Sequence, residues 1–201
     1  MSYQTVLFDF DGVLCKGRFY EKTLLPDYSE IYDWIQMNIF ENKEMVRNWM
    51  RNRVNSAEIN ELIAKNTGIE CNFLNELYEE SIRRMELEKE VKDLAELLKL
   101  SGKKIGIVTD NMDIFTKITI PNHRLDTLFD IIINSADYRI LKKDEKGKLF
   151  DVALAALGEK IENSLMVDDS ESTVELYRQK GGQGFVYKNP AELKSFLQTQ
   201  K

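Results

Sequence analysis

Short apolar runs that each stop at polar residues constrain the fold of this chain most strongly. The runs lie at residues 5–12, 104–110, 129–135 and 164–169, and a weaker one lies at 184–187. Unbroken apolar runs of this length are typical of strands that are buried on both faces, as in parallel sheets. The sequence therefore predicts a buried parallel sheet.

Helical patterns separate these runs. Residues 86–100 carry apolar side chains at helical spacing, which predicts one buried face made of Leu87, Val91, Leu94, Leu97 and Leu98. Residues 149–157 and 171–180 also have helical patterns, and Pro190 suits the first turn of a last helix. The alternation predicts an α/β fold with a doubly wound, Rossmann-like parallel sheet and helices on both faces.

One long segment breaks the alternation. Residues 16–85 contain amphipathic helical patterns and no convincing strand, and Asn55 with Glu58 makes a capping box at one expected helix start. We therefore expect an all-helical insert directly after the first strand. The predicted division places residues 1–15 and 86–201 in an α/β core domain and residues 16–85 in a helical domain.

The charge and the cysteines bound the class of protein. The 201 residues carry a net charge of −6, from 28 basic and 34 acidic residues, which disfavours a nucleic-acid or anionic-membrane partner. No apolar run approaches the roughly 20 residues that span a bilayer, and the amino terminus lacks a basic leader pattern. Two cysteines make neither a disulfide framework nor a four-ligand zinc site, so we expect a cytoplasmic protein. The oligomeric state stays open.

Polar residues gather where the predicted strands end. They are Asp9, Asp11, Thr109, Asp110, Asp168 and Asp169. The carboxyl ends of parallel strands meet at one edge of the sheet, where ligands bind. Crowded carboxylates raise one another's pKa unless a cation lies among them, and oxygen ligands without His or Cys favour Mg²⁺. His123 lies in a turn-like stretch and matches no metal spacing.

With these motifs the chain resembles the haloacid dehalogenase-like (HAD) hydrolase superfamily over nearly its whole length. Asp9-Phe10-Asp11-Gly12-Val13-Leu14 resembles the first motif of that family, Asp-x-Asp-Gly-x-Leu. Thr109 resembles the hydroxyl of the second motif, Lys142 falls in the region of the third, and Asp168-Asp169 resembles the acid pair of the fourth. The insert at 16–85 resembles the helical cap of the family, which selects the substrate.

The resemblance implies a Mg²⁺-dependent phosphohydrolase that acts on a small phosphomonoester. Asp9 would be the nucleophile that forms an aspartyl-phosphate, and Asp11 the acid and base. Magnesium would be held by Asp9, the backbone carbonyl of Asp11, Asp168 and, in support, Asp169. Thr109, the backbone of Asp110 and Lys142 would bind the phosphoryl oxygens. Family members that cleave carbon–halogen bonds lack the second acid, so Asp11 favours phosphoryl chemistry.

Several alternatives remain open at this point. No proline follows Lys142 as the family pattern expects, so Lys143 is a second candidate, with Lys146 and Lys148 behind it. In the insert, Arg18, Arg47, Arg51 and Arg53 could reach anionic substrate groups, whereas Trp34, Phe40 and Trp49 suit the core of the insert. A phosphomutase of the same superfamily and a catalytically idle binding protein are the alternative functions. A phosphoacceptor receiver is disfavoured because its paired acids come early in the chain.

Overall fold

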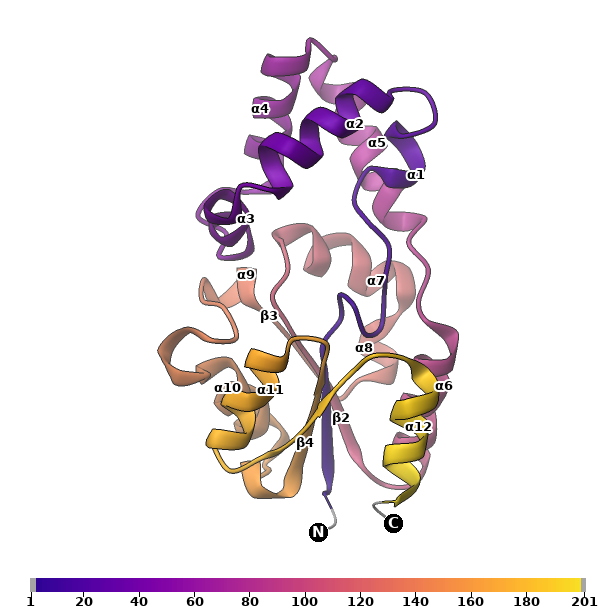
Figure 1. The fold of residues 1–201 in the computed structure, drawn as a ribbon, viewed down its shortest axis with the longest axis vertical. Helices are drawn as coiled ribbons and strands as arrows, with labels where there is room; N and C mark the ends of the chain where they lie inside the picture. The colour runs from indigo at the N-terminus through magenta and orange to yellow at the C-terminus, as the bar shows by residue number, and fades with distance from the viewer. Residues whose placement is uncertain (1–2, 200–201) are drawn as a thin grey trace.

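A five-stranded sheet forms the centre of the molecule in the computed structural model, which describes residues 3–199. The strands are β1 (Thr5–Phe8), β2 (Lys104–Thr109), β3 (Ile131–Asn134), β4 (Ser164–Asp168) and β5 (Gln183–Val186). Their order is β3-β2-β1-β4-β5, and every neighbouring pair is parallel. The predicted doubly wound α/β fold is confirmed, and Figure 1 shows the strands running upward from the amino terminus.

The strand register brings the polar residues level with one another. Phe8 pairs with Ile107 on one side and with Val167 on the other. The next backbone amide, that of Asp9, donates to the carbonyl of Val167 at 2.9 Å. Asp9 follows β1 directly, and Thr109 and Asp168 are the last residues of β2 and β4, so the three residues lie at the same edge of the sheet.

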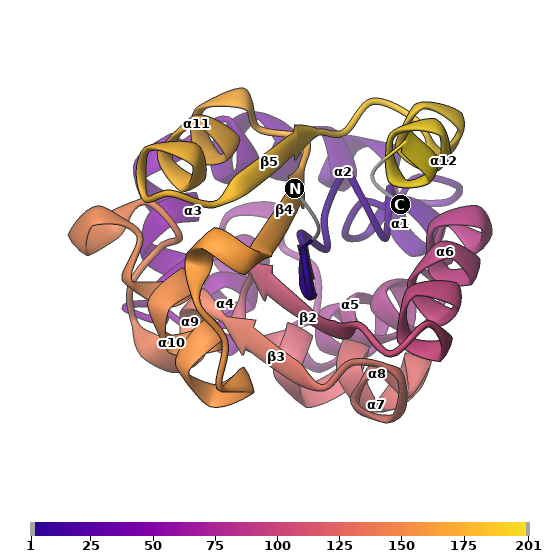
Figure 2. The ribbon, with the colours of Figure 1, turned by 90° about the horizontal axis from the view of Figure 1, so that it is seen from below.

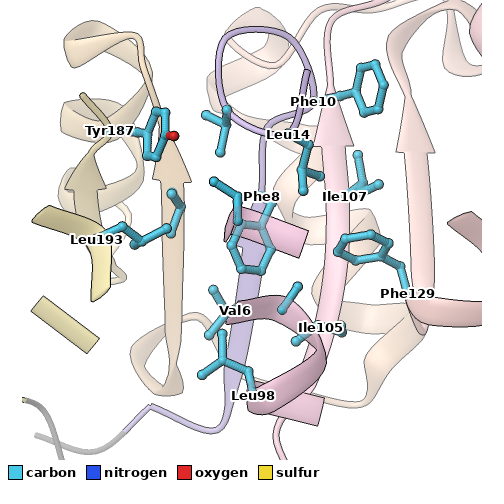
Figure 3. Packing of buried hydrophobic residues seen from close by; sticks show 14 of the residues in the cluster. Val6, Phe8, Phe10, Leu14, Leu98, Ile105, Ile107, Phe129, Tyr187 and Leu193 are labelled. Carbon is cyan, nitrogen blue, oxygen red and sulfur yellow. The ribbon is translucent and has the colours of Figure 1, made fainter. Parts of the chain in front are cut away.

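Helices cover both faces of the sheet, as Figure 2 shows. α6 (Lys89–Leu100) and α12 (Pro190–Thr199) pack on one face, and α10 (Lys148–Leu157) and α11 (Glu171–Gln179) pack on the other. The side chains of β1 alternate: Val6 and Phe8 point to the α6 side, whereas Leu7 points to the α10 side. Figure 3 shows the hydrophobic cluster on the α6 side of the sheet, in which Val6 and Phe8 pack with Leu98.

The prediction for the α6 face was wrong at Leu97. Its side chain is 61% exposed, because the buried line of α6 runs through Val91, Ala95 and Leu98. These positions are four and three residues apart and lie on one side of the helix. Leu97 lies outside that line.

Short helical segments connect the strands and the longer helices outside residues 16–85. They are η2 (Phe115–Thr119), α7 (Ile120–His123), α8 (Leu125–Leu128), α9 (Ser135–Tyr138), η3 (Asp144–Lys146) and η4 (Ile161–Asn163). The stretch that includes Pro121 and His123 is thus helical rather than turn-like. Pro121 is the second residue of α7, which continues directly from η2, and Arg124 ends that helix with φ 51°.

The segment after β1 is helical throughout its regular elements and lies over the carboxyl end of the sheet (Figure 1). Its elements are α1 (Glu21–Leu24), α2 (Ser29–Ile35), η1 (Gln36–Phe40), α3 (Lys43–Met50), α4 (Ser56–Thr67) and α5 (Cys71–Arg83). The predicted capping box of Asn55 and Glu58 opens α4. A separate hydrophobic cluster holds these helices together around Trp49, and it includes Met112, Ile114 and Ile118 from beyond β2.

Between residues 3 and 199, no helix combines the length and the apolar character that a membrane span requires.

Candidate active site

A tight loop after β1 positions the first two acids. The carbonyl of Phe10 accepts hydrogen bonds from Leu14 at 2.8 Å and from Cys15 at 2.9 Å. The ring of Phe10 is buried in the core, so the acids on either side of it face the sheet edge. Gly12 allows the turn with φ 79°, and a Cβ there would lie 2.3 Å from Oδ2 of Asp169. A side chain at position 12 would therefore displace the carboxylate of Asp169 and strain the turn.

A buried lysine joins the acids of two neighbouring strands. The ammonium of Lys142 lies 2.6 Å from Oδ2 of Asp9 and 2.7 Å from Oδ2 of Asp168. All three side chains are almost fully buried, at 5%, 9% and 0% exposure. One positive charge thus bridges two carboxylates at the carboxyl edge of the sheet. Ion pairs that are buried away from solvent are screened only weakly by dissolved salt.

Burial and repulsion raise the pKa values of the acids. Asp9 has a raised pKa mainly because it is buried; Lys142 opposes the rise and Asp168 adds to it. Burial likewise raises the pKa of Asp11 to about 7, against the attraction of Lys142. For Lys142, burial opposes the charged form, but Asp9 and Asp168 outweigh it and raise the pKa above its ordinary value. The carboxylates of the cluster can therefore carry more negative charge than Lys142 neutralises.

The acids fit a hard divalent cation. Asp9, Asp168 and Asp169 each offer a carboxylate oxygen, and these oxygens lie within 4.8 Å of one another. Carboxylate oxygens are the ligands that Mg²⁺ prefers in proteins. A second positive charge among them would also oppose the raised pKa values. The donor set of this chain is thus suited to magnesium.

Polar groups at the ends of β2 and β3 complete the site. Thr109 Oγ1 is buried and has no hydrogen-bond partner within residues 3–199, which leaves it free for a ligand oxygen. Oδ1 of Asp110 accepts from the backbone N–H of Lys142 at 2.7 Å and so fixes the lysine loop. Asn111 donates from Nδ2 to Oδ2 of Asp11 at 2.9 Å. Ser135 Oγ accepts from the backbone N–H of Asn111 at 3.0 Å.

Asn111 and Ser135 belong to this group of contacts but were not among the predicted site residues. Asn111 follows Thr109 and Asp110 directly, so its place at a strand end was a usable signal. Ser135 follows β3, the edge strand, and nothing in its local pattern separates it from an ordinary helix start. Its role shows only in the contacts that it makes with another loop.

The other candidate lysines lie outside this cluster. Lys143 Nζ contacts Ser172 Oγ at 2.9 Å, and Lys148 forms an exposed ion pair with Glu145 at 2.7 Å. Lys146 is exposed. His123, on α7, contacts the side chain of Asn122 at 3.4 Å. The structure brings Lys142 together with the acids.

The helical insert covers the site. A cavity of about 440 Å³ extends from Asp11 into the insert and is lined by Arg18 and Phe40, among others. Trp49 is fully buried in the insert cluster, and Trp34 is half-buried at its margin. Arg51 pairs with Asp144 at 2.8 Å instead of lining the cavity.

A Rossmann-like sheet that gathers acids and a buried lysine at its carboxyl edge, under a helical insert, is typical of enzymes of the α/β class, which bind their ligands at the carboxyl ends of the strands. Residues 3–175 match the haloacid dehalogenase-like hydrolases, and the chain therefore belongs to this family of enzymes.

Proteins of similar sequence and of similar structure agree with this family. The chain is 26% identical over 180 residues to pyrophosphatase PpaX of Bacillus cereus (strain AH820), covering 87% of this chain and 78% of that protein. A predicted HAD-like family hydrolase from Porphyromonas gingivalis has the same fold, with a TM-score of 0.75, 17% identity and full coverage of both chains. A HAD family enzyme from Bacteroides thetaiotaomicron, in complex with magnesium and inorganic phosphate, gives a TM-score of 0.69 at 18% identity, over 93% of this chain and 95% of that one.

Proposed function

We propose that the protein is a Mg²⁺-dependent phosphatase that hydrolyses a small phosphomonoester through an aspartyl-phosphate on Asp9. The observation that carries this proposal is the buried bridge from Asp9 through Lys142 to Asp168, with Asp11 beside it. The names of the relatives support phosphoryl chemistry, since one is a pyrophosphatase and another binds inorganic phosphate with magnesium.

Two aspartates divide the chemistry in this proposal. The carboxylate of Asp9 attacks phosphorus, the bond from phosphorus to the leaving oxygen breaks, and Asp11 protonates that oxygen. Asp11, now ionised, takes a proton from water, which attacks phosphorus and releases phosphate and free Asp9. The pKa of Asp11, raised by burial to about 7, suits a group that gives and takes a proton near neutral pH.

The remaining residues hold charge. Magnesium would be held by the carboxylates of Asp9 and Asp168 and the backbone carbonyl of Asp11, with Asp169 in support. When bound, it supplies positive charge that stabilises the phosphoryl oxygens in the transition state. The unpartnered hydroxyl of Thr109, the backbone N–H of Asp110 and the ammonium of Lys142 would bind the same oxygens.

We also propose that residues 16–85 act as a cap and that residues 1–15 and 86–201 form the core. The two connections between these parts lie side by side. The backbone carbonyl of Leu14 accepts a hydrogen bond from the N–H of Glu88 at 2.8 Å, and Cys15 forms an isolated antiparallel β-bridge with Leu87. Two adjacent crossings are suited to a hinge, and closure would exclude water from the reacting groups.

A cytoplasmic location is proposed with this function. Cys15 and Cys71 are both free thiols, and burial raises the pKa of Cys15 to about 11, so it is a poor thiolate. Free thiols suit a reduced compartment.

The test is phosphate release from p-nitrophenyl phosphate and a panel of phosphomonoesters, with magnesium and with EDTA, for wild type and Asp9→Asn. We expect magnesium-dependent turnover by wild type and background release by the variant, with unchanged melting of the fold. Turnover by Asp9→Asn at the wild-type rate would contradict the nucleophile. A folded, magnesium-loaded wild type that releases no phosphate would contradict hydrolysis.

A further inference from the structure

The cavity beside Asp11 has mostly apolar walls. Its volume is about 440 Å³, and Phe40, Val46 and Met50 of the insert face it together with Met112 of the core. Because Asp11 would protonate the leaving oxygen, the leaving group of a substrate would occupy this cavity. Apolar walls favour a partly apolar organic group there.

The cationic side chains that line the cavity are turned to solvent. Lys16 lies 3.4 Å from a carboxylate oxygen of Glu88. Lys16 and Arg18 are both exposed. Inside the cavity, a second phosphate in the leaving group would lie against mostly apolar walls, which is unfavourable.

One polar group of the cavity lacks a partner. Gln36 lines the cavity, and its amide Nε2 is buried with no hydrogen-bond partner among the described residues. Buried amide donors are almost always paired, and an unpaired one is unfavourable. An acceptor atom of a bound ligand would satisfy it.

A local irregularity of the helix places this amide. η1 is a single π-helical turn, closed by the bond from Glu41 N–H to the carbonyl of Gln36 at 3.0 Å. Such turns are rare and occur frequently at functional sites. This turn contributes both Gln36 and Phe40 to the cavity wall. It thus presents one donor and one aromatic ring to the same ligand.

We propose that Gln36 is a specificity-determining residue, and that it donates a hydrogen bond to a neutral oxygen on the leaving group of the substrate. The substrate class is a phosphomonoester of an uncharged, partly apolar alcohol that carries a carbonyl, ether or hydroxyl oxygen. Pyrophosphate is a poor substrate, because its leaving group is a second phosphate. This inference rests on the proposed phosphatase function.

The test compares two matched pairs of aryl phosphates of similar size and leaving-group acidity. In each pair, the meta- or para-methoxyphenyl phosphate carries an ether oxygen, whereas the matching ethylphenyl phosphate carries none. Binding is measured by calorimetry on Asp9→Asn with magnesium, so that it does not depend on turnover. The same measurement is made on Asp9→Asn/Gln36→Met and on the control Asp9→Asn/Gln179→Met, in which the replaced glutamine is exposed on α11.

We expect Asp9→Asn and the Gln179 control to prefer a methoxy ligand about tenfold, and Gln36→Met to lose the preference. Equal preference with and without Gln36, or no preference in any variant, would overturn the inference. In wild-type kinetics, a higher kcat/KM for pyrophosphate than for the methoxyphenyl phosphates would overturn it as well. If the binding preference depends on Gln36 but wild type hydrolyses nothing, the cavity assignment stands and the proposed hydrolysis fails.

Discussion

The guanidinium of Arg51 forms a two-point hydrogen bond with the carboxylate of Asp144, 93 residues further along the chain. Nε donates to Oδ2 at 2.8 Å and Nη2 donates to Oδ1 at 2.9 Å. Oδ2 of Asp144 also accepts from the backbone N–H of Leu141 at 2.9 Å, the residue before Lys142. The helical insert is therefore tied directly to the loop that carries the buried lysine.

Loss of this link is predicted to loosen the lysine loop. We expect Arg51→Ala to lower kcat/KM for p-nitrophenyl phosphate about tenfold, because a charge-assisted pair positions the loop next to Lys142. Arg51→Lys will not restore the rate, since an ammonium cannot form the two-point geometry. The control is Arg53→Ala, whose guanidinium contacts Asn48 at 3.3 Å. Equal rates for Arg51→Ala and Arg53→Ala would contradict the prediction.

Lys142 and Lys143 are predicted to differ sharply. Lys142→Met removes the ammonium that bridges Asp9 and Asp168, and we expect a loss of about 10²- to 10³-fold in kcat. Lys143→Met removes an exposed contact with Ser172 and should leave kcat within about twofold. Steady-state kinetics on the two variants decide the matter. A larger loss in Lys143→Met would reassign the third-motif lysine.

Magnesium is predicted to stabilise the folded protein through the acid cluster. At a concentration 100 times its dissociation constant, the ion should add about 2.7 kcal/mol to the free energy of unfolding. Thermal melts with and without magnesium should show this rise for wild type and for the surface control Asp126→Asn. Asp168→Asn should show a smaller rise, because it removes one of the clustered carboxylates. An undiminished magnesium shift in Asp168→Asn would place the ion elsewhere.

Asp113 is predicted to make stability depend on acid pH. Burial would raise its pKa, but hydrogen bonds from Lys117 at 2.6 Å and Ser56 at 2.6 Å outweigh burial and lower the pKa below 3.8. A lowered folded-state pKa stabilises the protein above about pH 3.8 and ceases to do so as the pH falls through the folded-state value. We expect Asp113→Asn to cost about 1.5–3 kcal/mol at pH 7.

Urea unfolding of wild type and Asp113→Asn at several pH values measures this difference. The gap between the two proteins should shrink below about pH 3.8, the ordinary aspartate value. The exposed Asp126→Asn serves again as the control and should show no gap at pH 7. A gap that stays constant down to the acid limit would mean that the charge of Asp113 is not what stabilises the fold.

The sheet and the acids could be predicted because their signals are local. Each strand is a short apolar run, and Asp9, Asp168 and Thr109 stand at the ends of such runs. Parallel topology then brings the ends together without further information. The capping box of Asn55 and Glu58 was equally local, since both residues lie within one helical turn.

The rest depends on contacts between distant residues. Asn111 reaches Asp11 across 100 residues, and no pattern around either residue shows the contact. Gln36 is one polar residue in an amphipathic helix, and its significance comes from a π-helical turn that propensity does not predict. Leu97 fitted the helical period, but α6 lies on the sheet along Val91 and Leu98. Tertiary packing decided each of these cases.

The position of β1 has a consequence for synthesis on the ribosome. β1 is made before the other four strands, yet it lies in the middle of the sheet: Thr5 pairs with Lys104 on one side and with Ser164 on the other. The strand that precedes Asp9, the proposed nucleophile, therefore emerges unpaired and gains its second neighbour only after β4 has been translated. Pairings this distant in sequence slow folding, and an unpaired apolar strand is prone to aggregate meanwhile. The helices of residues 16–85 pack mainly on one another and can begin to form before β1 has paired with β4, although their cluster is completed only by Met112, Ile114 and Ile118.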